Sequence, residues 1–131
     1  MSLKKCAIQD DDFQVIMDAV LASDCLVLAA PVYWNSPPGI MKDFIDRTHG
    51  YYACGDVLRG KSAFVLSVAT ASGFDTHENI MESWVKCYGA QVQGRLRLLA
   101  QEKDDVRTDP ARIARVEGFA EDVIAWCGER R

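Results

Sequence analysis

The feature that most constrains the fold is an uninterrupted apolar run, Cys25 to Ala30, that leads directly into a loop rich in proline and aromatic residues. The run does not alternate between apolar and polar residues, as a strand with one face in water would. A short run of this kind is typical of a strand buried on both faces, as in a parallel sheet covered by helices on each side. We therefore expect an α/β fold built around this strand.

Helical and strand patterns alternate along the rest of the chain. A second buried strand is predicted from Ala63 to Ala69, and a third, from Gln91 to Leu99, alternates like a strand at the edge of a sheet. Apolar residues three and four positions apart predict helices in four ranges: 11–22, 38–48, 76–88 and from Asp109 onward. This order predicts one domain, a three-layer α/β sandwich with a parallel sheet, and 131 residues suffice for its core.

The loop after the first strand, Pro31 to Ser36, reads Pro-Val-Tyr-Trp-Asn-Ser. Proline stiffens this backbone, and Ser36 is expected to cap the next helix, with Pro37 in its first turn. In open parallel sheets, ligands bind in the crevice beyond the carboxyl ends of the strands. We therefore expect the loop to hold its aromatic and amide side chains at a ligand site: Tyr33, Trp34 and Asn35.

A second loop of small residues, Thr70 to Thr76, follows the second strand. Gly73 allows the backbone to approach a ligand closely, and free N–H groups at the start of the next helix can hold a carbonyl group or an anion. His77, in the first turn of that helix, has two interpretations. It is either a hydrogen-bond donor to the ligand or a histidine exposed to solvent.

Composition and charge exclude several classes of protein. The net charge of −4 is spread along the chain, whereas a nucleic-acid surface needs a clustered basic patch. No signal peptide is recognised, and no apolar run approaches the ~20 residues of a membrane span. Five cysteines without a Cys-x-x-Cys pair indicate neither a disulfide framework nor a zinc site, and favour a reducing cytoplasm. Small molecules or proteins are the expected partners.

These motifs together resemble a known family. The Pro-Val-Tyr-Trp-Asn-Ser loop, followed by Ile-Met-Lys-Asp-Phe-Ile-Asp-Arg at 40–47, is similar to the flavin-contacting loop of the NADPH-dependent FMN reductase family, which has a flavodoxin-like fold. The likeness extends to residues 8–13 and 88–96 and is strongest to the iron-sulfur flavoprotein branch. It implies FMN as cofactor, with NAD(P)H and a small electron acceptor as substrates. It also implies two flavin-contacting segments: Pro31, Val32, Tyr33, Trp34, Asn35 and Ser36, and Thr70, Ala71, Ser72 and Gly73.

The sequence departs from the family pattern at its start. The family opens with a strand, a Ser/Thr/Gly-rich loop that binds the FMN phosphate, and a second strand, none of which this sequence contains. The resemblance therefore implies an N-terminally truncated flavodoxin-like domain. In a sheet of strand order 2-1-3-4-5, the run 25–30 would become an exposed edge, which natural sheets pair or cover. We therefore expect a homo-oligomer that uses this run, or the first helix and the residues before it.

Two functions are consistent with this pattern. The first is an FMN-dependent NAD(P)H oxidoreductase of the flavin or quinone reductase type, or its truncated form. In that case the flavin supplies the redox chemistry, and no catalytic side chain is assigned. The alternative is a flavin-free α/β interaction or dimerisation module that has lost the phosphate loop.

Cys6 alone cannot hold an iron-sulfur cluster, which needs four ligands.

Three further groups have competing interpretations. The run Asp10 to Asp12 is either a metal site or a helix cap, and capping is favoured because adjacent aspartates cannot all turn toward one ion. The pair Asp46 and Arg47 is either catalytic or structural, and a structural role near a helix end is favoured. Tyr51 and Tyr52 open a connection to Gly60. They either shield a flavin or a subunit contact, or pack on the helix below.

Overall fold

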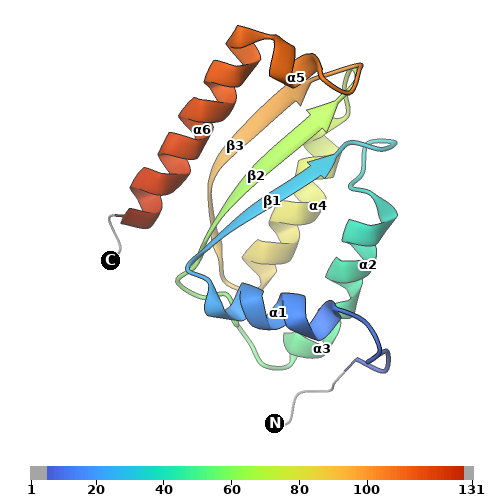
Figure 1. Ribbon diagram of the computed structural model, residues 1–131. Coiled ribbons are helices and arrows are strands. Elements are labelled where there is room, and N and C mark those ends of the chain that lie inside the picture. The colour runs from blue at the N-terminus through green and yellow to red at the C-terminus, as the bar shows by residue number, and fades with distance from the viewer. Residues whose placement is uncertain (1–5, 129–131) are drawn as a thin grey trace.

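The computed structural model describes residues 6–128 and confirms the α/β sandwich (Figure 1). Three parallel strands form one sheet in the order β1-β2-β3. The elements in chain order are α1 (Phe13–Ala22), β1 (Cys25–Pro31), α2 (Gly39–Arg47), α3 (His49–Tyr52), β2 (Ser62–Ala69), α4 (Phe74–Cys87), β3 (Gln91–Leu99), α5 (Asp105–Thr108) and α6 (Pro110–Gly128).

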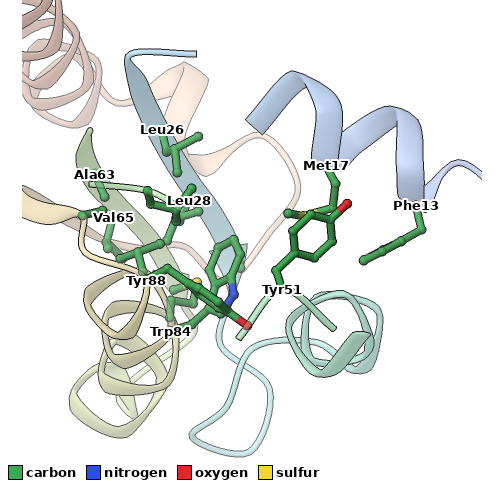
Figure 2. Close-up of a cluster of buried hydrophobic side chains, with 14 residues drawn as sticks. Phe13, Met17, Leu26, Leu28, Tyr51, Ala63, Val65, Trp84 and Tyr88 are labelled. Carbon is green, nitrogen blue, oxygen red and sulfur yellow. The ribbon is translucent and has the colours of Figure 1, made fainter. Parts of the chain in front are cut away.

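The core lies between the sheet and α4 and is closed at one end by α1 and α3 (Figure 2). Leu26 and Leu28 of β1 pack beside Ala63 and Val65 of β2, because parallel register partners face the same side of a sheet. The largest side chains that complete this cluster come from the helices and from the residue that follows α4: Phe13, Met17, Tyr51, Met81, Trp84 and Tyr88.

Strand β1 is an edge strand, as expected, but it is not buried on both faces as predicted. Leu26 and Leu28 are buried, whereas Val27 between them is 48% exposed. The reason is that α6, which covers the opposite face of the sheet, packs mainly on β3 and reaches β2 through Phe119 against Phe64, 5.9 Å between ring centroids. One face of β1 is therefore left open.

The ends of α2 differ from the prediction. Helix α2 starts at Gly39 without a side-chain cap, because Ser36 is held in the preceding turn and its hydroxyl donates to the carbonyl of Pro37. Gly50 does not end the helix but lies within α3. The break comes at Thr48, which is buried and accepts hydrogen bonds from Nε1 of Trp84 (2.9 Å) and the hydroxyl of Tyr88 (2.7 Å).

The two tyrosines of α3 have different roles. Tyr51 is buried in the core, and its hydroxyl accepts a hydrogen bond from Nε2 of Gln14 on α1. Tyr52 is 60% exposed and stacks on His49. Tyr51 therefore packs against the neighbouring helix, one of the two interpretations open from the sequence.

Arg47 ties the residues before α1 to the end of α2. Its guanidinium pairs with the carboxylate of Asp11 at 2.5 Å and lies 4.2 Å from the ring centre of Phe13. Asp11 also accepts the N–H of Phe13, so the aspartate run caps α1 through Asp11, whereas Asp12 at the N-cap makes no side-chain cap hydrogen bond. Arg47 is structural, as favoured, but Asp46 pairs with Lys42 instead of its neighbour.

Two arginines of β3 bind two buried glutamates of α4. Arg97 donates to both oxygens of Glu78 (2.9 and 2.7 Å), and Arg95 does the same with Glu82. The Arg95 guanidinium lowers the pKa of Glu82 to about 2. The polar face of the alternating strand β3 is therefore covered by α4 through ion pairs.

The last helix begins as predicted, with the Asp109 carboxylate accepting the N–H of Ala111. Its inner face is rotated from the predicted one, since Ile124 is 70% exposed. The half-buried apolar residues of α6 are Val116, Phe119, Val123, Trp126 and Cys127. Because α6 covers only part of the sheet, none of its residues is fully buried.

Candidate functional site

The first predicted loop leaves β1 and folds into a tight turn. Val32 extends the sheet by donating its N–H to the carbonyl of Val68 (2.7 Å). Tyr33 and Ser36 then exchange two backbone hydrogen bonds, of 2.8 and 3.0 Å. The two residues at the corner of this turn are Trp34 and Asn35.

Both corner residues have a left-handed backbone, with φ of 50° for Trp34 and 59° for Asn35. Turns of this type prefer Asn-Gly, because residues with a Cβ are strained there. A tryptophan at such a position is unfavourable, and its side chain is 98% exposed. Backbone strain combined with a fully exposed aromatic residue is characteristic of binding sites.

The second predicted loop lies against the first. Gly73, with φ of 96°, precedes α4, and a Cβ atom on it would overlap Oδ1 of Asn35 and lie 3.0 Å from Val32. The structure thus brings Val32, Asn35 and Gly73 together at the carboxyl ends of β1 and β2, the position expected for a ligand site.

The start of α4 offers hydrogen-bond donors at this position. Helix α4 begins at Phe74 without a side-chain cap. Within the described part of the chain, the N–H groups of Ala71, Ser72 and Gly73 have no acceptor. Thr70, Ala71 and Ser72 are exposed, so these donors are available to a carbonyl group or an anion.

Two buried polar side chains lie on the layer between the sheet and α4. His77, one turn into α4, is 0% exposed, so the solvent-exposed interpretation is wrong. Neither of its ring nitrogens has a partner within residues 6–128, nor does the hydroxyl of Ser67, near the end of β2. Ser67 was not predicted as a site residue, although a polar residue inside the apolar run 63–69 could have indicated it. Unpaired buried polar atoms of this kind call for a water molecule or a ligand group as partner.

These features fit the ring system of a flavin better than its phosphate. A flat aromatic ring with a polar edge requires an aromatic surface and a row of N–H donors, which the two loops supply. Residues 6–128 contain no second Ser/Thr/Gly-rich loop that leads into a helix and could hold a phosphate. In the same range, no three His, Cys, Asp or Glu side chains are grouped as metal ligands, and no helix is long and apolar enough to span a membrane.

A scan against protein families matches residues 2–104 to the NADPH-dependent FMN reductase family. This chain belongs to that family. The matched range includes both loops. Membership in the NADPH-dependent FMN reductase family gives FMN as the cofactor and NAD(P)H as a substrate. A search among curated proteins gave no match.

Solved structures similar to this member of the NADPH-dependent FMN reductase family share its fold. An NADPH-quinone reductase from P. pentosaceus is 16% identical, with a TM-score of 0.68 over 88% of this chain and 76% of that one. General stress protein 14 from Treponema denticola, solved with FMN, is 20% identical, with a TM-score of 0.63 over 93% and 75%. A WrbA-like flavodoxin from Agrobacterium tumefaciens is 12% identical, with a TM-score of 0.67 over 88% and 73%. The fold is flavodoxin-like.

Proposed function

We propose that residues 6–128 form a single flavodoxin-like domain that acts as an FMN-dependent NAD(P)H oxidoreductase of the flavin or quinone reductase type. The observation that carries this proposal is the contact of Asn35 with Gly73, which joins the two loops at the carboxyl ends of β1 and β2. Bound FMN would supply the hydride and electron transfer between NAD(P)H and a small acceptor.

The residues of the two loops bind and orient the cofactor. Tyr33 and Trp34, exposed on the first loop, cover the face of the ring and exclude water from it. The N–H groups of 71–73, which have no acceptor, and the amide of Asn35 would donate hydrogen bonds to the polar edge of the ring. No side chain needs to act as an acid or a base, so we assign no catalytic residue.

Affinity for FMN is low in this chain, because a phosphate is normally held by several backbone N–H groups at a helix start. The loop 70–73 is assigned to the ring, and no second loop of this kind lies in residues 6–128. The purified protein should therefore be colourless. A yellow preparation with one FMN per chain would show that the phosphate is held in a way that these residues do not explain.

Anaerobic reduction of added FMN by NADPH or NADH tests the activity. The flavin-free interaction module is the competing function, and the family match disfavours it. The oxidoreductase predicts that the protein accelerates loss of flavin absorbance at 450 nm above the rate of free FMN. Equal rates with and without protein, at an FMN concentration that saturates binding, would support the module instead.

We also propose a homo-oligomer formed through the free edge of β1. Val32 donates to Val68, so the even-numbered residues of β1 direct their backbone groups toward β2. The others direct theirs outward: Cys25, Val27, Ala29 and Pro31. An antiparallel second copy centred on Leu28 gives each outward N–H a carbonyl acceptor. The carbonyl of Cys25 alone lacks a donor, because Pro31 opposite it has no N–H.

Light scattering at micromolar concentration tests this assembly. A specific interface should bury more than about 1,000 Å². Val27→Lys places a charge beside the edge and should give monomers, whereas Ile124→Lys on exposed α6 should leave the assembly intact. A monodisperse monomer of the unmodified protein would refute the proposal.

A cytoplasmic location is consistent with the five cysteines, all free in the structure. The proposal extends to the electron acceptor, a small molecule such as a quinone or free flavin. Competition between the two for reduced protein in a stopped-flow assay would identify the preferred acceptor. A resident iron-sulfur cluster would need ligands beyond Cys6.

A further inference from the structure

Two cysteines from opposite ends of the chain meet at the end of the sheet away from the candidate site. Cys25 is the first residue of β1, and Cys127 lies in the last turn of α6. Figure 1 shows the C-terminal end of α6 beside the start of β1. The Cys127 side chain is near enough to Cys25 to act on the pKa of its thiol.

The backbone supports this contact. Burial alternates along β1, so Cys25 shares the side of the sheet with Val27 and Ala29, opposite Leu26 and Leu28. That side carries α6, as the contact of Phe119 with Phe64 shows. Both cysteines are half-buried, so a small reagent can reach them.

We propose that Cys25 and Cys127 form a disulfide that joins α6 to the start of β1 when the protein meets a small disulfide such as oxidised glutathione. This inference is independent of the proposed flavin chemistry. It assigns a modification site to two residues outside the candidate site.

The reaction is thiol–disulfide exchange. One protein thiolate attacks a sulfur of the small disulfide, forming a mixed disulfide and releasing one small thiolate. The second protein thiolate then attacks the protein sulfur of that bond and releases the other small thiolate. Two protein thiols become one disulfide, and one small disulfide becomes two small thiols, so atoms and electrons balance.

The surroundings of the pair determine when it reacts. Burial, followed by the neighbouring Cys127 side chain, raises the pKa of Cys25 to about 11, so this residue stays protonated at neutral pH. Protonated thiols resist direct oxidation, because the thiolate is the reactive form. Exchange needs a thiolate as well, so the pair stays reduced in a reducing compartment and closes slowly when small disulfide is in excess.

The bond would hold a helix that is otherwise weakly attached. No residue of α6 is fully buried, so its packing resists separation less than that of α4, which buries Met81 and Val85 completely. A cross-link between Cys25 and Cys127 closes a long loop and restricts the unfolded chain, which stabilises the folded state. We expect the midpoint of thermal unfolding to rise by about 10 °C.

Peptide mapping of the whole protein tests the proposal. The protein is incubated with oxidised glutathione, its free thiols are alkylated, and it is digested without reductant. The expected results are a linked peptide pair that contains Cys25 and Cys127, and a rise in the midpoint of thermal unfolding of the oxidised protein. Cys127→Ser and Cys25→Ala should each abolish both, and a folded Cys127→Ser variant alone is sufficient for this test.

The exposed cysteines provide matched controls. Cys54→Ser and Cys87→Ser should retain the linked pair and the temperature shift. In the unmodified protein, Cys54 and Cys87 also report that the reagent was active, because they should form mixed disulfides with glutathione. Recovery of Cys25 and Cys127 as alkylated thiols, alongside glutathionylated Cys54 and Cys87, would overturn the proposal.

Discussion

The side-chain oxygen of Asn35 occupies the space that a Cβ atom on Gly73 would need. The two loops of the candidate site therefore pack as one unit, and only glycine fits at that point of the second loop. The left-handed backbone of Gly73 imposes the same restriction independently.

Gly73→Ala should separate the two loops. The new Cβ would collide with Asn35, so we expect a loss of about 2 kcal/mol in the free energy of unfolding and an FMN affinity at least tenfold lower. Gly55→Ala is the matched control, since Gly55 has φ of 78° but an open environment. Gly55→Ala should lower the free energy of unfolding only by the cost of backbone strain. Chemical denaturation and FMN titration of both variants measure the difference, and equal effects would exclude the collision.

Replacing Trp34-Asn35 by Asn-Gly should stabilise the protein while weakening flavin binding. Both positions are left-handed, and Asn-Gly is the preferred pair for such a turn, so we expect a gain of about 1 kcal/mol. The replacement also removes the exposed indole ring. Thermal unfolding and FMN titration should therefore change in opposite directions. A stabilised variant with unchanged FMN affinity would show that Trp34 is not a flavin contact.

Stability should fall in acid as Glu82 is protonated. Its folded pKa, about 2, lies below the ordinary value of 4.5, so its stabilising contribution is complete above pH 4.5 and is lost as the pH falls toward 2. Glu82→Gln should lose about 2 kcal/mol at pH 7, allowing for screening around half-exposed Arg95. Denaturation of both proteins between pH 2 and 7 should show the two curves converging in acid. A constant difference would contradict this account.

Arg47→Lys should loosen the residues before α1 without unfolding the protein. Lysine keeps the charge but loses the paired contacts of the guanidinium with Asp11 and its position over Phe13. Amide exchange of residues 6–12 should become faster than in the unmodified protein. Lys42→Gln, which breaks only the exposed pair with Asp46, should leave these rates unchanged.

The sequence predicted the elements and the position of the two loops because their signals are local. The apolar runs indicate their own strands, Asp109 caps the helix that it precedes, and the small residues of 70–73 indicate the loop that they form. The ends of α2 were predicted wrongly because they depend on distant residues. Thr48 is held by Trp84 of α4 and by Tyr88, which follows that helix, and no local pattern near Gly50 indicates this contact.

Burial of His77 and Ser67 could not be predicted for the same reason. Both lie in the layer between the sheet and α4, and their burial depends on how the two pack. The open face of β1 likewise depends on the position of α6. The alternation along β3 was read correctly as an edge strand, but the partners of Arg95 and Arg97 become known only from the docking of α4.

FMN titration of the unmodified protein, Trp34→Ala and Asn35→Ala tests the central claim most directly. Trp34 is almost fully exposed, so its removal should change the free energy of unfolding by less than about 0.5 kcal/mol and leave the fold intact. The account predicts saturable quenching of FMN fluorescence by the unmodified protein and at least tenfold weaker binding by both variants. Unchanged affinity in both variants would show that the flavin does not bind at the Pro31 to Ser36 loop.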